Sequence, residues 1–294
     1  QQAAAAAPTA AVKPEGGGGA AAAGGRLTKS TESFKVLTEC PLIVMLLFQL
    51  YPAYIQSTIP HLIPLMVNAL ALRAGPPSAA QRAQYADLMA AQVKTLSFLT
   101  YLLRAFADFM AAYQESIPKC VIQLLLAAPP DSTSIRKDIL VATRHILATD
   151  FRAGFFPQID TLLSEELLLG GRVGPGARSS HEALRPLACS TLADLVHHVR
   201  AELSMPQLAR VVFLFSRNIH DAALPLSIHT TSVRLLLNLV ENIFHKPDAD
   251  ARALLVRILE ALVNKFATLR RHIPRVLAEV AAGEAAAEAA AARS

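Results

Sequence analysis

Residues 85–113, YADLMAAQVKTLSFLTYLLRAFADFMAAY, decide the fold class. Large apolar residues recur in this stretch at steps of three and four, which is the spacing of one face of an α-helix. A second apolar edge runs beside the first, so we expect this helix to pack between two neighbours, as in a stacked array. The first edge consists of Leu96, Leu99, Leu103, Phe106 and Met110, and the second of Phe98, Leu102 and Phe109.

The same helical spacing returns further along the chain, and alternating stretches rich in Val, Ile and Thr, which strands require, are missing. It occurs at Val233, Leu236, Val240 and Ile243, and at Leu255, Leu259, Leu262, Phe266 and Leu269. Breaks rich in Gly and Pro fall at 75–78, 129–132 and 170–180. They divide the chain into expected helices at 30–50, 53–72, 80–113, 116–127, 132–149, 156–168, 180–203, 205–219, 227–244 and 248–270.

Five prolines share one local pattern, in which an apolar residue precedes the proline and a polar and an apolar residue follow it. Proline is tolerated in the first turn of a helix, so the pattern predicts five helix starts. The intervals are 58, 39, 49 and 68 residues; two are near the HEAT period of roughly 40–47, and the long ones need insertions or a missed repeat. We therefore predict an all-α, HEAT-like α-solenoid of about five antiparallel helical hairpins. The prolines are Pro60, Pro118, Pro157, Pro206 and Pro274.

The composition predicts three parts along the chain. Residues 1–25 are rich in Ala and Gly and are expected to be a disordered leader. Residues 26–275 form the expected solenoid segment, and residues 276–294 form a tail rich in Ala and Glu. The most apolar run, 41–50, is too short to cross a bilayer, which takes roughly 20 residues, so we expect a buried helix and no membrane partner.

The net charge of +5 is not carried by any block of like charge. The densest basic cluster, Arg270-Arg271-His272 with Arg275, suits a solvated helix end, where cations complement the helix dipole. A nucleic-acid groove would require a stripe of Lys and Arg with stacking aromatics, so no direct nucleic-acid site is predicted. The mild excess of base fits an acidic protein partner.

No group of residues in the sequence predicts catalysis, a metal or a cofactor. The adjacent His197 and His198 diverge by about 100° on a helix and do not form a metal pair, although one of them could bond to Asp194. The span 171–176 has the glycine spacing of a phosphate loop but lacks the Lys-Ser/Thr that follows, so we expect a flexible loop. Glu165 and Glu166 are expected on the polar side of a helix.

The three cysteines lie far apart in apolar runs, without a C-x-x-C motif. They are expected to be buried free thiols, which favours a reducing compartment. The cysteines are Cys40, Cys120 and Cys189.

Five blocks between about residues 33 and 270 resemble, in order, the HEAT region of the transformation/transcription domain-associated protein (TRRAP) family, which includes its yeast counterpart. Each block is a helix-length string, so the similarity is more specific than a general likeness to HEAT repeats. The blocks are SFKVLTECPLIVMLLFQLY (33–51), YADLMAAQVKTLSFLTYLLR (85–104), RKDILVATRHILATDFR (136–152), LRPLACSTLADLVHHVR (184–200) and LLLNLVENI (235–243).

The resemblance implies an early HEAT portion of a giant nuclear scaffold. Members of this family resemble phosphatidylinositol-3-kinase-related kinases but lack working catalytic residues, and they sit in histone acetyltransferase assemblies of the SAGA and NuA4/TIP60 kinds. Their helical repeats receive transcription activators, which brings the acetyltransferase to chromatin. The implied partners are subunits of those complexes, acidic activation domains and other parts of the full-length chain, and the implied location is the nucleus.

An acidic, disordered activation segment with embedded aromatics and leucines prefers a shallow apolar groove rimmed by Lys or Arg. Basic residues on otherwise apolar helices are therefore the candidate protein-binding residues. They are Arg144, Arg185, Arg200, Arg210 and Arg217.

Two other functions remain open for a helical solenoid. One is the regulatory solenoid of an active phosphatidylinositol-3-kinase-related kinase, which intact ATP-binding motifs elsewhere in the protein would reveal. The other is a nuclear transport receptor, which would be expected to carry acidic inner faces for basic cargo; the net charge of +5 disfavours it.

Overall fold

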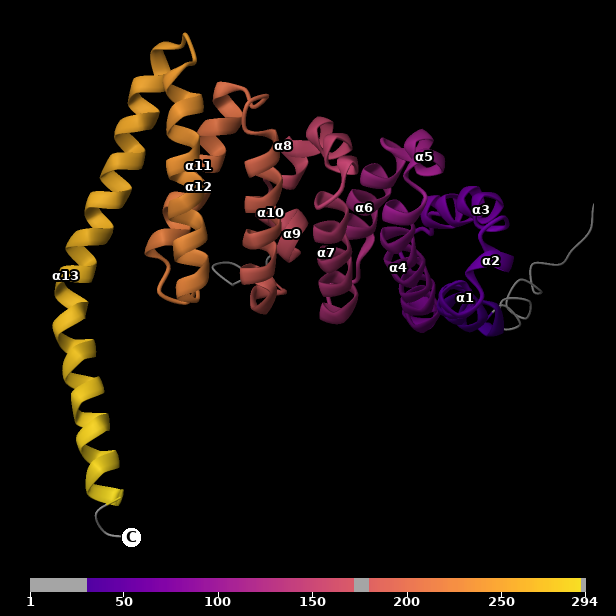
Figure 1. Ribbon diagram of the computed structural model, residues 1–294, viewed down its shortest axis with the longest axis horizontal. Coiled ribbons are helices and arrows are strands. Elements are labelled where there is room, and N and C mark those ends of the chain that lie inside the picture. Colours follow the sequence, from indigo (N-terminus) through magenta and orange to yellow (C-terminus); the bar gives the residue numbers. More distant parts are fainter. Residues whose placement is uncertain (1–30, 172–179, 292–294) are drawn as a thin grey trace, which may run out of the picture.

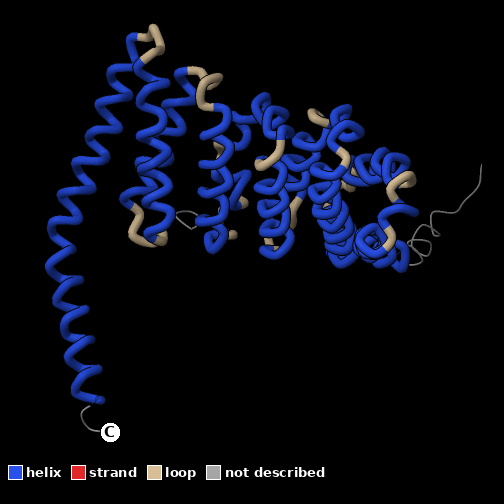
Figure 2. Tube along the Cα trace, in the orientation of Figure 1, coloured by secondary structure: helices blue, strands red, loops and turns tan. Residues whose placement is uncertain are grey.

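Helices form all the regular structure in the computed structural model, which describes residues 31–171 and 180–291 (Figure 2). Figure 1 shows them ranged side by side along one long axis. The predicted all-α solenoid is confirmed. The leader, 1–25, lies outside the described residues.

The helices pair into five successive hairpins, as predicted, and each hairpin contributes to both of two layers. Consecutive helices of the first layer pack on one another: α1 on α4, α4 on α7, α7 on α10, and α10 on α12. The first layer comprises α1 (Thr31–Leu50), α4 (Arg82–Ala105), α7 (Thr133–Leu147), α10 (Arg185–Val199) and α12 (Leu226–Phe244). The second comprises α3 (Ile59–Ala71), α6 (Ser116–Ala127), α8 (Ile159–Leu162) with α9 (Glu165–Leu169), α11 (Met205–His220) and α13 (Ala249–Ala291).

Three of the five prolines occupy the first turn of a helix, as predicted. They are Pro60 in α3, Pro118 in α6 and Pro206 in α11, where the Ser204 and Gln207 side chains add a capping box. Pro157 lies instead in a 3₁₀ segment, Asp150–Gln158, just before α8.

The predictions for the last helix are wrong in two respects. Pro274 does not start a helix, and the helix does not end near residue 270, because α13 continues without a break to Ala291. Its predicted start is confirmed, since the Asp248 carboxylate accepts the backbone N–H of Asp250 at 2.9 Å.

The helix predicted over 80–113 is also interrupted. It ends at Ala105, and Phe106, with φ −133° and ψ 44°, redirects the chain into the short α5 (Ala107–Met110). The turn buries Phe106, whose ring meets Phe48 of α1 edge-on at 5.6 Å. Aromatic packing between the first two hairpins therefore overrides the helical period. Phe109, expected on a packed edge, is exposed, while the other seven residues of both edges are buried.

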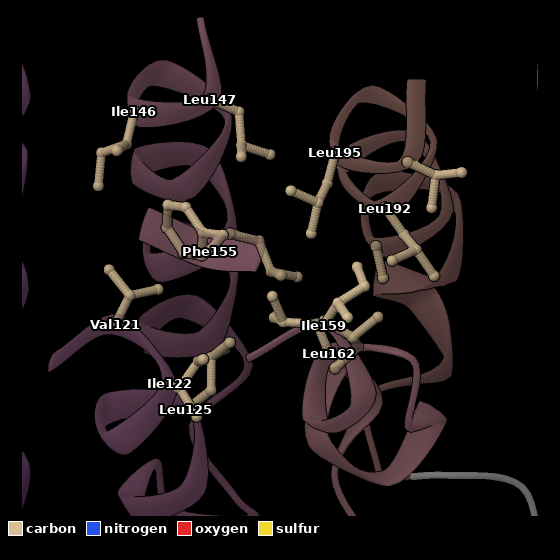
Figure 3. Close-up of a cluster of buried hydrophobic side chains, with 14 of the residues drawn as sticks. Val121, Ile122, Leu125, Ile146, Leu147, Phe155, Ile159, Leu162, Leu192 and Leu195 are labelled. Atoms are coloured by element: carbon tan, nitrogen blue, oxygen red, sulfur yellow. The ribbon is translucent and has the colours of Figure 1, made fainter. Parts of the chain in front are cut away.

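The helix predicted over 156–168 is replaced by the 3₁₀ segment and the short helices α8 and α9. The segment passes so close to the start of α6 that a Cβ on Gly154 would lie 2.1 Å from the carbonyl oxygen of Gln114, just before α6, and 2.9 Å from Pro118 within it. This close approach places the fully buried Phe155 in a cluster with side chains of α6, α7, α8 and α10 (Figure 3). One aromatic ring thus joins three successive hairpins.

Candidate functional site

The described residues do not assemble a metal centre. No three His, Cys, Asp or Glu side chains of this part of the chain converge as metal ligands. The rings of His197 and His198 meet edge-on at 5.4 Å, and both side chains are exposed. Asp194 bonds to Arg144 rather than to either histidine. Of the residues with phosphate-loop spacing, all but Gly171 lie outside the described residues.

Two of the three cysteines are buried, as expected, but Cys40 is exposed. The prediction for Cys40 is wrong because no described element packs over this side of α1. Burial raises the pKa of Cys189 to about 11, so this thiol is protonated and unreactive at neutral pH. None of the described helices is both long and apolar enough to span a membrane.

The five candidate arginines all have partners within the chain. Four of them form ion pairs with carboxylates that join successive hairpins: Arg144 of α7 to Asp194 of α10 at 3.3 Å, Arg185 of α10 to Glu165 of α9 at 2.9 Å, Arg210 of α11 to Asp160 of α8 at 3.1 Å, and Arg217 of α11 to Glu165. Arg200 donates to the carbonyl of His197, near the end of its own helix. These side chains lie mainly between repeats.

Glu165 is the centre of the best-defined polar cluster. Its carboxylate accepts hydrogen bonds from Arg185 at 2.9 Å and from Arg217, while Arg185 also pairs with Glu182. The Arg185 side chain is only 13% exposed and that of Glu165 28%. The bonds to Glu182 and Glu165 raise the pKa of Arg185, so it stays charged. Glu165 is therefore a link between α9, α10 and α11 rather than only the polar side of a helix.

Sequence reasoning missed a second, buried polar cluster around Arg136 of α7. Its guanidinium donates to the carbonyls of Leu125 at 2.9 Å, at the end of α6, and of Leu167 in α9. His181 lies nearby, almost fully buried, with Nδ1 2.9 Å from the Thr133 hydroxyl. Its backbone N–H bonds to Leu169, so the cluster fixes both ends of the segment 170–180. A histidine just after a glycine-rich break was the available signal.

Because of His181, folding should become less favourable as the pH falls below about 6.5, the ordinary pKa of histidine. Burial and the Arg136 charge lower the pKa of His181, although the hydrogen bond with the Pro129 backbone and the Asp131 charge oppose the shift. Below about pH 6.5 the unfolded chain binds a proton at His181 more readily than the folded chain does. The contribution of the neutral His181 to the free energy of unfolding is therefore complete above this pH and is lost as the pH falls through the lowered pKa. Urea unfolding at several pH values measures the effect.

The variant His181→Gln should lose most of this pH dependence, because its side chain cannot take up a proton. His198→Gln is the matched control: the pKa of His198 is also lowered, by burial and by Arg152, but this side chain is exposed, so its replacement should remove a smaller part of the pH dependence than His181→Gln. Equal pH dependence in the His181 variant and the parent chain would contradict the assignment.

A groove of about 760 Å³ opens against α4 and α6 of the second hairpin, between the connecting segments 73–77 and 128–132. Its lining combines apolar side chains such as Leu126 with Tyr85, with two arginines, Arg73 and Arg82, and with one carboxylate, Asp131. The Tyr85 hydroxyl is tied to the Ala127 carbonyl at 2.8 Å.

The fold and these surfaces define a HEAT-type helical solenoid. The profile of the family described as "Tra1 HEAT repeat central region" matches residues 84–293. The chain therefore belongs to the family of Tra1 and the transformation/transcription domain-associated protein. The predicted family is confirmed, and the matched region is a HEAT-repeat region rather than a catalytic domain. The profile describes the central HEAT region of the family, whereas the sequence suggested an early portion of its HEAT repeats.

Several relatives show the same relationship over most of the chain. The "Probable transcription-associated protein 1" of Dictyostelium discoideum is 42% identical over 257 residues, 86% of this chain and 6% of the relative. The human "Transformation/transcription domain-associated protein" is 40% identical over 253 residues, 84% of this chain and 6% of the relative. The "SAGA complex/NuA4 acetyltransferase complex subunit Tra1" of Schizosaccharomyces pombe is 39% identical over 263 residues, 83% of this chain and 7% of the relative. The chain thus spans a small fraction of its relatives' length.

Proposed function

We propose that this chain is a non-catalytic scaffold segment of a TRRAP-like pseudokinase that recruits histone acetyltransferase complexes to chromatin in the nucleus. The observation that carries the proposal is the 39% identity, over 83% of the chain, to a relative named as a subunit of the SAGA and NuA4 acetyltransferase complexes. Solenoids of stacked hairpins present long surfaces, which suits a scaffold.

The finer part of the proposal is that the segment docks acidic activation domains. The groove against α4 and α6 offers apolar side chains such as Leu126 beside two arginines, Arg73 and Arg82, although Asp131 also lines it. Arg144, Arg185, Arg200, Arg210 and Arg217 remain the proposed protein-binding residues of the solenoid body. Their intramolecular bonds mean that an activator would have to share or displace the existing partners.

Affinity purification of the full-length protein from nuclei, followed by mass spectrometry, tests the scaffold proposal. Acetyltransferase-complex subunits should be recovered with it. Recovery of import cargo, or of a phosphorylating activity, without those subunits would overturn the proposal. For docking, charge reversal of the five arginines should weaken capture of an acidic activation domain; unchanged capture by the folded variant would remove these residues from the proposed surface.

A further inference from the structure

The groove against α4 and α6 brings an exposed apolar side chain together with two arginines. Arg73 lies in the segment after α3, and Arg82 begins α4. Leu126 of α6 lines the same groove and is 60% exposed, although its neighbours Leu124 and Leu125 are buried. Helices of the first and third hairpins pack on α4 and α6 from either side (Figure 1), so the groove does not belong to an end face of the array.

The charges of the two arginines are not balanced by the protein. Neither Arg73 nor Arg82 forms an ion pair with a described carboxylate, and that includes Asp131 of the same groove. Arg73 donates to the carbonyls of Leu70 and Leu72 at 2.8 and 3.0 Å, which fixes its position without neutralising it. The arginines that link the later hairpins, by contrast, are paired with carboxylates. The groove therefore offers two positive charges to a ligand.

The single carboxylate of the groove lies apart from the arginines. Arg73 is close enough to Tyr85 for its charge to oppose the rise that burial causes in the pKa of that phenol. Asp131 lies in the other connecting segment, close enough to His181 to oppose the fall in the pKa of that imidazole. The lining thus has a basic side at the start of α4 and an acidic position after α6.

The end of α6 beside the groove is held by two other helices. The last carbonyls of a helix have no partner within it. Here the Tyr85 hydroxyl of α4 donates to the carbonyl of Ala127 at 2.8 Å, and Arg136 of α7 donates to that of Leu125 at 2.9 Å. Each connecting segment also contains a Pro-Pro pair, which restricts its backbone. The groove is therefore preformed, which lowers the entropic cost of binding.

The size of the groove limits the form of its ligand. Its volume of about 760 Å³ is within the range of roughly 300–1,000 Å³ that is typical of small-ligand pockets. A helix with its side chains is about 10–12 Å wide, so several turns of helix would not fit. A few residues of an extended segment would.

We propose that this groove binds a short extended segment of a partner protein in which a large apolar side chain lies next to carboxylates. The apolar side chain would pack on Leu126 and the Tyr85 ring, and the neighbouring Asp or Glu residues would pair with Arg73 and Arg82. The inference rests on the proposed docking of acidic activation domains, and it gives one of their contacts a place apart from the five arginines that link hairpins.

A short labelled peptide with Glu on both sides of a single Leu is the probe, and fluorescence anisotropy measures its binding. The variant Arg73→Glu/Arg82→Glu should bind it at least tenfold more weakly. The matched control Arg234→Glu/Arg252→Glu should bind like the parent chain, because it reverses two exposed arginines outside the groove that also lack an ion pair with a described carboxylate. Equal weakening in both variants would show that only net charge matters and would overturn the proposal.

The apolar contact has its own pair of variants. Leu126→Asp should weaken binding of the peptide at least tenfold, whereas Leu237→Asp, at a leucine of α12 that is 53% exposed, should not. Asp131→Asn should strengthen binding, because it removes the one carboxylate of the lining. Unchanged affinity in Leu126→Asp would overturn the proposed contact.

A charge exchange keeps the test valid if a variant loses stability. Arg73→Glu/Arg82→Glu should gain affinity for the same peptide with Lys in place of Glu, which an unfolded groove could not do. Arg82→Glu alone places a carboxylate in the first turn of α4, where the helix dipole favours it, so this variant should fold like the parent chain and still bind the acidic peptide more weakly. Loss of affinity for both peptides in the double variant, with unchanged affinity in Arg82→Glu, would overturn the proposal.

The same variants in the full-length protein separate this inference from the proposed function. Arg73→Glu/Arg82→Glu should weaken capture of an acidic activation domain there. Capture at the strength of the parent protein, together with recovery of acetyltransferase-complex subunits, would reject the groove and leave the proposed scaffold function intact. Absence of those subunits from the parent protein would reject the proposed function, whatever the peptide does.

Discussion

Replacing Phe155 by Ala should reduce the free energy of unfolding by about 4 kcal/mol. The ring is fully buried in a cluster with side chains of α6, α7, α8 and α10 (Figure 3). The substitution leaves a cavity that these helices can close only in part. In a solenoid each hairpin is stabilised mainly by its neighbours, so a cavity at this junction also weakens coupling between the two halves of the array. Urea unfolding followed by circular dichroism should show a lower midpoint and a broader or divided transition.

The control for this prediction is Phe213→Ala. Phe213 belongs to α11 and is 64% exposed, so its removal should change stability by less than about 0.5 kcal/mol. A loss of less than about 1 kcal/mol in Phe155→Ala would show that the junction can collapse around the smaller side chain.

Local signals predicted the helices that have a clear start and end. The bounds of α6, α7, α11 and α12 lie within about two residues of those expected, because prolines, caps and glycine- or proline-rich breaks delimit them. The failures occur where tertiary packing decides. Phe106 leaves its helix to pack on Phe48, and Gly154 permits a contact with α6 that no periodicity encodes.

The arginines could be located on helices from the sequence, but their partners could not. Arg144 and Asp194 are 50 residues apart, as are Arg210 and Asp160, and Arg217 and Glu165 are 52 apart. These separations are close to one repeat, so a solenoid places such residues side by side. A search for opposite charges one repeat apart would have found the ion pairs, once the repeat length of this part of the chain was known.

The expected effect of Arg136→Met is a loss of about 3 kcal/mol of stability. Arg136 is 4% exposed, and no described carboxylate lies within ion-pair distance of it. Its charge is balanced instead by carbonyls of α6 and α9, the groups that a helix leaves unpaired in its last turn. Methionine fills a similar volume but leaves those buried carbonyls without donors, and each charged hydrogen bond contributes about 1.5–3 kcal/mol.

Arg144→Met is the matched control because Arg144 lies on the same helix, with its side chain 45% exposed in a surface ion pair. Such pairs contribute about 0–1 kcal/mol, so the control should change little. Arg136→Met should also reduce the pH dependence assigned to His181, because the Arg136 charge is one cause of its lowered pKa. A stable variant with unchanged pH dependence would show that the guanidinium gives no net stabilisation; loss of both together would establish Arg136 and His181 as one cluster holding the segment between α9 and α10.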